Sequence, residues 1–215
     1  MKVGVLGSGI VGQVLSAGFQ KHGYPVMIGT RNPKAKNTQD WLAKNPGMQL
    51  GTFADAAKFG EILVLAVLGR VVENVIQLAG AENLVGKTIL DTTNPLADSP
   101  PSSGVLNYFT GPNESLGERI QALLAKSHVV KGFNSVGSTR MVSPQFEQGT
   151  PTMFFCGNDR NAKRQVSEII SQFGWEPFDC GGIAAARAIE PLCMLWCIPG
   201  FLNNQWTHAF KLLTH

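Results

Sequence analysis

Apolar and polar residues alternate along the chain in blocks that predict strands and helices in turn. Short apolar runs rich in β-branched residues predict strands, and the blocks between them carry apolar residues at helical spacing. The predicted strands are Lys2–Leu6, Tyr24–Gly29, Gln49–Thr52, Glu61–Val67, Thr88–Asp91, Val129–Phe133, Thr152–Cys156 and Glu176–Asp179. The predicted helices are Ile10–Lys21, Asn32–Asn45, Asp55–Phe59, Val71–Ala79, Glu114–Leu124 and Asn161–Phe173.

This order of elements predicts an α/β fold with a doubly wound parallel sheet. The run Glu61–Val67 is apolar on both faces, as is typical of a parallel strand covered by helices on both sides. We therefore predict one domain over residues 1–183. A small helical extension over residues 184–215 would then contribute to an acceptor pocket, a dimer contact, or both.

Composition excludes several classes of protein. Of the 215 residues 44% are hydrophobic and 15% charged, and the net charge of +3 is spread along the chain without a basic stripe, so nucleic-acid binding is not expected. Apolar stretches such as Ile62–Leu68 are far shorter than the ~20 residues of a membrane span, and no secretory signal is evident. We expect a cytoplasmic protein with four reduced cysteines. Cys193 and Cys197 lack further ligands at metal-binding spacing, so no metal site is expected.

A glycine-rich turn follows the first predicted strand and opens the first helix. Its residues match the pattern GxGxxG and are Gly7, Ser8, Gly9, Ile10, Val11 and Gly12. In such a turn the first glycine permits the tight bend, the second lets a pyrophosphate approach the backbone, and the third lets helix and strand pack closely. The helix N-terminus adds free amides and a partial positive charge. We interpret this unit as a Rossmann-type dinucleotide site.

The end of the second strand predicts which dinucleotide binds. Enzymes selective for NAD place a carboxylate there to bind the ribose 2′-hydroxyl, but this chain has Thr30, Arg31 and Asn32, and no carboxylate lies between Gly23 and Gln39. The planar guanidinium of Arg31 can bind a 2′-phosphate, and lysines such as Lys36 can add charge. We therefore predict NADP(H) as the cofactor.

The ends of the later strands carry small, apolar and amide side chains. They show no evident acid–base pair, and His128 belongs to the opposite end of its strand, while His22, His208 and His215 lie in a turn or in the tail. Reduction of a simple ketone needs a proton donor, whereas hydride transfer to a flavin-like ring needs mainly orientation and exclusion of water. We therefore assign no catalytic side chain and favour a flavin-type acceptor.

Several motifs together resemble one known family. They are Gly7–Gly12, Gly29–Pro33, Thr93–Pro95, Val129–Asn134, Cys156–Asp159 and Ala188–Leu192, in that order. This series resembles the NADPH-dependent deazaflavin (F420) oxidoreductases and the cytosolic reductase domain of six-transmembrane metalloreductases. The resemblance spans most of residues 1–195 and implies direct hydride exchange between NADPH and a flavin or deazaflavin. This chain departs from the metalloreductases in showing no transmembrane extension, so haem-linked metal reduction is not expected.

The resemblance also implies roles for individual residues. The adenosine and phosphate half of the cofactor would contact Ser8, Ile10, Val11, Thr30, Arg31 and Asn32. The nicotinamide would be flanked by Ala66, Val67, Asn94 and Pro95, and the acceptor pocket would be bordered by Phe133 and Asn134. The aromatic tail Trp196–Leu213 would cap this pocket, pack on a second subunit of a homodimer, or form ordinary core.

Two other functions agree with the same residues. A short reductase of carbonyl or imine substrates would share the N-terminal half, and turnover of such substrates without a response to flavins would identify it. A non-catalytic NADPH-sensing module would bind the cofactor tightly and transfer no hydride. In either case the expected partner remains a small molecule or a regulated protein rather than nucleic acid or membrane.

Overall fold

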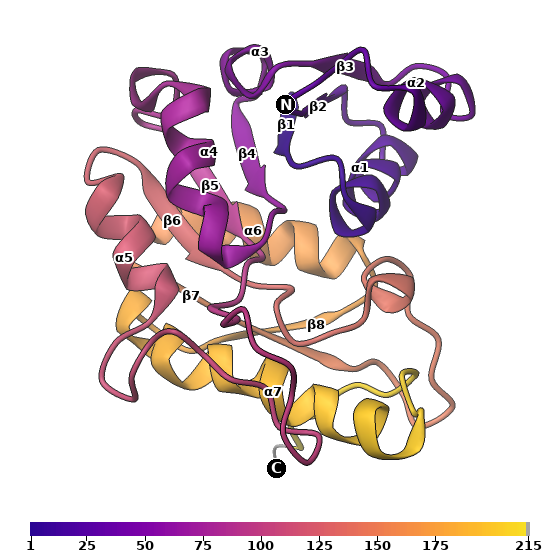
Figure 1. Cartoon of the computed structure of the whole chain (residues 1–215), viewed down its shortest axis with the longest axis vertical. Coiled ribbons are helices and arrows are strands. Elements are labelled where there is room, and N and C mark those ends of the chain that lie inside the picture. Colours follow the sequence, from indigo (N-terminus) through magenta and orange to yellow (C-terminus); the bar gives the residue numbers. More distant parts are fainter. Residues whose placement is uncertain (214–215) are drawn as a thin grey trace.

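The computed structural model describes residues 1–213, and His215 lies outside them. Eight strands form a sheet in the order β3-β2-β1-β4-β5-β6-β7-β8 (Figure 1). The strands are β1 (Val3–Leu6), β2 (Val26–Gly29), β3 (Gln49–Gly51), β4 (Ile62–Leu65), β5 (Thr88–Asp91), β6 (His128–Lys131), β7 (Thr152–Gly157) and β8 (Glu176–Asp179). The helices are α1 (Ile10–Lys21), α2 (Lys36–Ala43), α3 (Phe53–Phe59), α4 (Val72–Ala79), α5 (Leu116–Leu123), α6 (Arg160–Gln172) and α7 (Ala186–Asn203). The predicted doubly wound fold is confirmed.

Helices cover both faces of the sheet, and each face has its own hydrophobic core. The core under α1 and α6 includes Val3, Val5 and Val64, whereas the core under α3, α4 and α5 includes Leu6 and Leu65. Consecutive residues of β1 and β4 therefore point to opposite cores, as expected for strands whose side chains alternate between faces. This two-sided burial explains why the β4 sequence is apolar throughout.

Two strands, β7 and β8, depart from the predicted parallel sheet. β7 runs antiparallel to β6, while β8 is parallel to β7. A parallel connection needs a crossover, usually a helix, but residues 132–151 contain only a short 3₁₀ turn at Ser138–Arg140. Without a crossover helix the chain returns at the same end of the sheet, so β7 enters in the reverse direction.

The C-terminal extension is only partly helical. The helix α7 ends at Asn203, and Asn204 adopts a left-handed backbone with φ of 54°. Residues 204–213 then return to β7 in a non-helical course, where the Thr152 N–H donates to the Phe210 carbonyl and the Trp196 indole donates to the His208 carbonyl. The predicted helical extension is therefore confirmed over α7, whereas residues 204–213 are not helical because they hydrogen-bond to the start of β7.

The C-terminal helix was predicted, but its apolar length differs from the expectation of short apolar stretches. The segment Ile183–Asn203 is long and apolar enough to cross a membrane by length and composition, with a mean hydropathy of 1.3. Helices packed inside folded proteins meet the same criterion, and here Glu190, on this helix, is 2% exposed and paired with Lys131. Its apolar length was not expected because Arg187, Glu190 and two prolines interrupt its apolar runs.

A capping box fixes the start of α3, which places Phe53 beside the candidate site. The Asp55 N–H donates to Thr52 Oγ1 at 3.1 Å, and the Thr52 N–H donates to Asp55 Oδ2 at 2.9 Å. We expect Thr52→Ala to lower the free energy of unfolding by about 1 kcal/mol, measured by urea denaturation. Thr52→Ser, which keeps the hydroxyl, should remain close to the unmodified protein; equal losses in both variants would contradict this account.

Candidate functional site

The glycine-rich turn joins β1 to α1, and each of its glycines meets a different constraint. Gly7 has φ of +138°, and a Cβ there would lie 2.1 Å from the Ala66 carbonyl oxygen. A Cβ on Gly12 would lie 2.0 Å from the Gly7 carbonyl oxygen, whereas a Cβ on Gly9 would meet no atom within 4 Å. Gly7 and Gly12 therefore serve the packing of the turn. Gly9 leaves an open approach to the backbone, which is where a pyrophosphate would need space.

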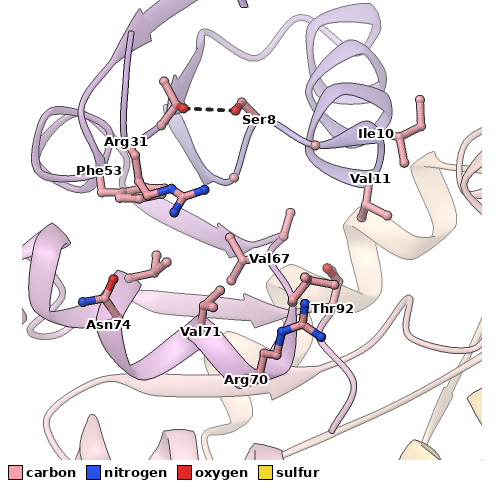
Figure 2. A pocket seen from close by; sticks show the side chains of 16 residues that line it. Ser8, Ile10, Val11, Arg31, Phe53, Val67, Arg70, Val71, Asn74 and Thr92 are labelled. Carbon is pink, nitrogen blue, oxygen red and sulfur yellow. Dashed lines mark hydrogen bonds between the residues drawn. The ribbon is translucent and has the colours of Figure 1, made fainter. Parts of the chain in front are cut away.

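The first turn of α1 is left available for an anion. No side chain caps this helix, and its first turn contains no acidic residue. The Ser8 hydroxyl donates to Thr30 Oγ1 at 3.1 Å and so links the turn to the end of β2 (Figure 2). Free amides, the helix dipole and two hydroxyls thus face one place, and this arrangement suits a phosphate group.

A cavity of about 600 Å³ lies over the ends of β1, β2 and β4. Nine of the predicted cofactor residues line it: Gly7, Ser8, Gly9, Ile10, Val11, Thr30, Arg31, Ala66 and Val67. Figure 2 shows Arg31 beside Phe53 at this cavity, with Val67 and Val71 nearby. Within residues 1–213 the exposed Arg31 guanidinium makes no ion pair, so its charge is available to a ligand.

Seven predicted residues lie elsewhere: Gly12, Asn32, Lys36, Asn94, Pro95, Phe133 and Asn134. Gly12 packs against the turn, the Asn32 carboxamide accepts the Lys34 N–H at 3.1 Å, and Lys36 begins α2 with its side chain exposed. The ring of Phe133 is fully buried against Phe173, with centroids 5.7 Å apart, so it belongs to the core and does not form a wall of this cavity.

Seven residues of the cavity were absent from the predicted set: Phe53, Leu68, Arg70, Val71, Asn74, Val75 and Thr92. Most of them follow β4 directly, where parallel strands present their carboxyl ends. That rule could have found them, but Val71–Ala79 was predicted only as a helix, without a role in the site. Arg70 pairs with Asp98 at 2.8 Å in an exposed position, so its charge is already partly satisfied.

Asn94 and Asn134 form a second polar group at the ends of β5 and β6. The Asn94 amide donates to the Asn134 backbone carbonyl at 2.8 Å. The Asn134 amide donates to Asn94 Oδ1 at 3.1 Å and to the Ile189 carbonyl at 3.0 Å. Asn134 Oδ1 is buried and has no hydrogen-bond donor among the described residues, which leaves an unsatisfied acceptor just after β6. The N–H of a nicotinamide carboxamide is a donor of the kind that this acceptor lacks.

A fully buried lysine lies beside this polar group. Lys131 Nζ is 2.6 Å from Asp91 Oδ2 and 2.9 Å from Glu190 Oε1, and it donates to the Thr93 carbonyl at 2.9 Å. Burial alone would lower the pKa of Lys131, but the two carboxylates outweigh it and raise the pKa above its usual value. We call Lys131, Asp91 and Glu190 the ion triad.

The ion triad corrects the expectation that charged groups are missing from the strand ends. Lys131 was placed inside its strand, but it is the last residue of β6 and pairs in register with Asp91, the last residue of β5. Neighbouring strands end at the same edge, so these two residues could have been brought together from the sequence. Glu190 could not, because it comes from α7, which is distant in the chain.

The remaining histidines and cysteines lie outside the cavity wall. His128 begins β6, and its Nδ1 lies 3.8 Å from Asp159 Oδ2, while His22 stacks on Phe173 and His208 on Trp196. The four cysteines are free, and residues 1–213 contain no group of three or more side chains suited to a metal ion. The Tyr108 hydroxyl donates to the Glu190 backbone carbonyl, and burial raises its pKa.

Comparisons with known proteins agree with this geometry. Residues 2–95 match the sequence profile of the family described as "NADP oxidoreductase coenzyme F420-dependent". The chain is 30% identical over 206 residues to the metalloreductase STEAP3 of Rattus norvegicus and 29% identical over 192 residues to the metalloreductase STEAP2 of Homo sapiens. These matches cover 94% and 88% of this chain but only 39% and 35% of the relatives, so the chain spans well under half their length.

Solved structures share the fold over nearly the whole chain. A crystal structure from Arthrobacter sp. FB24, named provisionally as an F420-dependent NADP-reductase, is 32% identical with a TM-score of 0.93, and the match covers 100% of both chains. An imine reductase from Aspergillus terreus in complex with NADPH4 is 17% identical with a TM-score of 0.68 over 94% of this chain and 63% of that one. At that identity the second likeness concerns the fold alone.

Proposed function

Because the chain belongs to the family of coenzyme F420-dependent NADP oxidoreductases, and is therefore an NADP(H)-dependent oxidoreductase, we propose that it exchanges a hydride between NADP(H) and a flavin-like ring. F420 is the first candidate acceptor, and FMN or FAD follow. One observation supports this class of acceptor above others. The cavity is lined by glycine, apolar, hydroxyl and amide residues with two arginines, and none of these lining residues is Asp, Glu, His, Lys, Cys or Tyr.

The reaction needs little from such a wall except orientation. When bound, NADPH supplies a hydride from its nicotinamide ring, and a deazaflavin or flavin takes up that hydride together with a proton from water. The glycine turn and the α1 amides would hold the pyrophosphate, and Arg31 the 2′-phosphate. Apolar residues such as Val67 and Leu68 would exclude water, and Asn94 with Asn134 would orient the carboxamide.

The acceptor can be identified by anaerobic mixing of purified protein with NADPH and F420, FMN, FAD or a quinone, following the nicotinamide absorbance at 340 nm. We expect rapid loss of absorbance with F420 or one flavin and little with the others. Turnover of imines or carbonyls without any response to flavins would replace this proposal with a small-substrate reductase. Tight NADPH binding with no transfer to any acceptor would favour a sensor. The cytoplasmic location and the homodimer remain predictions. Size-exclusion chromatography with light scattering can test whether the protein is a dimer.

A further inference from the structure

The ion triad carries a net negative charge inside the protein. Both oxygens of Glu190 accept N–H groups, because Leu116 N donates to Oε2 at 3.0 Å and Gly117 N donates to Oε1 at 2.9 Å. Asp91 Oδ1 accepts the Thr93 N–H at 2.9 Å and the Thr93 hydroxyl at 2.7 Å, while Oδ2 faces Lys131. Asp91 Oδ2 has no hydrogen-bond donor in suitable geometry among the described residues, but it lies 2.6 Å from Lys131 Nζ. Counted by formal charge, two carboxylates and one ammonium leave one negative charge, with exposures of 0% for Asp91 and Lys131 and 2% for Glu190.

This charge lies just behind the wall of the cavity. Thr92 lines the cavity, and it stands between Asp91 and Thr93, both of which belong to the network of the ion triad. The Thr92 hydroxyl donates to the Leu65 carbonyl at 2.8 Å, so it connects the end of β5 to the end of β4. Asn134, which has the free acceptor oxygen, follows Lys131 by three residues. Figure 2 shows Thr92 across the cavity from Arg31, so the ion triad lies behind the wall on the side away from Arg31.

We propose that the ion triad sets the hydride-donating strength of the bound cofactor, by stabilising the positively charged nicotinamide of NADP⁺ over the uncharged ring of NADPH. In hydride transfer the C–H bond of the nicotinamide breaks, and the hydrogen moves to the acceptor with both electrons of that bond. The nicotinamide is left with one positive charge. A fixed negative charge nearby lowers the free energy of that state. Asp91, Lys131 and Glu190 are thus positioning residues, since they act through the field without touching the reacting atoms. The inference depends on NADP(H) binding and not on which acceptor is used.

The expected effect is large enough to measure. At a separation of roughly 10 Å and an effective dielectric constant of about 20, one elementary charge changes the affinity for a cation about tenfold. The low exposure of the ion triad limits screening by salt, so the effect should persist at physiological ionic strength. The α5 amides that bind Glu190 offset part of the negative charge, so tenfold is an upper expectation for each carboxylate.

The test is the ratio of the dissociation constants for NADP⁺ and NADPH, measured by titration calorimetry on the full chain. We expect Glu190→Gln to weaken NADP⁺ binding up to about tenfold more than NADPH binding, because it removes one negative charge at nearly constant shape. Asp91→Asn should shift the ratio in the same direction and provides a second variant if the first does not fold. Glu190→Asp keeps the charge while shortening the side chain, so its ratio should stay near that of the unmodified protein even if its stability falls.

A matched control is Glu118→Gln, on α5, which removes the half-buried partner of the exposed Arg187. Its ratio of dissociation constants for NADP⁺ and NADPH should equal that of the unmodified protein. The proposal is overturned if Glu190→Gln and Asp91→Asn change both affinities by the same factor, because this outcome indicates a purely structural role. It is also overturned if Glu190→Asp shifts the ratio as far as Glu190→Gln does. None of these binding measurements depends on turnover. If the assigned acceptor is wrong, the anaerobic mixing experiment shows it, whatever the binding ratios are.

Discussion

Replacement of Arg31 by alanine is expected to raise the dissociation constant for NADPH about ten- to a hundredfold and to leave that for NADH nearly unchanged. A hydrogen bond to a charged group contributes roughly 1.5–3 kcal/mol, and only NADPH carries the 2′-phosphate that the guanidinium would bind. The structure supports this role because Arg31 lies at the cavity and makes no ion pair within residues 1–213. Titration of both nucleotides against both proteins measures the change.

Arg164→Ala is a suitable control for the Arg31 variant. Arg164 is an exposed arginine on α6 and does not line this cavity, so its removal changes the net charge equally without touching the site. Its preference for NADPH over NADH should equal that of the unmodified protein. Retention of the full preference in Arg31→Ala, or equal loss in both variants, would rule out Arg31 as the group that selects the cofactor.

The variants Gly9→Ala and Gly12→Ala are expected to lose different properties, cofactor binding in the first and thermal stability in the second. At Gly9 a Cβ meets no protein atom within 4 Å, so Gly9→Ala should fold with unchanged thermal stability but bind NADPH at least tenfold more weakly, because the methyl group occupies the pyrophosphate approach. At Gly12 a Cβ would lie 2.0 Å from the Gly7 carbonyl oxygen, so Gly12→Ala should lower the melting temperature by several degrees.

Differential scanning fluorimetry with and without NADPH separates the two effects. Gly9→Ala should match the unmodified protein without NADPH and lose most of the stabilisation that NADPH brings, since that stabilisation depends on affinity. Gly12→Ala should already melt lower without the cofactor. If Gly9→Ala bound NADPH normally, the pyrophosphate would have to lie elsewhere, and the assignment of the glycine turn as the phosphate site would be wrong.

Local patterns were sufficient to predict most of the architecture. The helix Ile10–Lys21 and the strands Thr88–Asp91 and Glu176–Asp179 agree with the structure to the residue. Gly9 and Gly23 flank the helix, and the first of the two strands is buried at every position. The direction of β7 depends on how a long loop returns to the sheet, and no local pattern records that course. The absence of a predicted helix between residues 133 and 152 was nevertheless a usable sign that the crossover was missing.

The residues of the candidate site also divide into those that local sequence predicts and those that it does not. The glycine turn and Arg31 were predictable because a short motif and one strand end contain the necessary chemistry. Glu190 was not, because its role depends on α7 bringing a carboxylate to Lys131 across 59 residues of sequence. Phe133 shows the opposite error, since its ring points into the core with Phe173 although its neighbour Asn134 reaches the polar group. Adjacent residues at a strand end can therefore have opposite surroundings.

Two separate stretches of the chain supply the two charged features of the site. The glycine turn and Arg31 lie in the first 31 residues, whereas the ion triad draws on residues 91, 131 and 190. Natural variation in the early stretch can therefore alter which nucleotide is chosen while the later residues keep the electronic surroundings of the ring. Descendants of one ancestral gene could diverge in cofactor choice and in driving force independently, through substitutions that never share a contact.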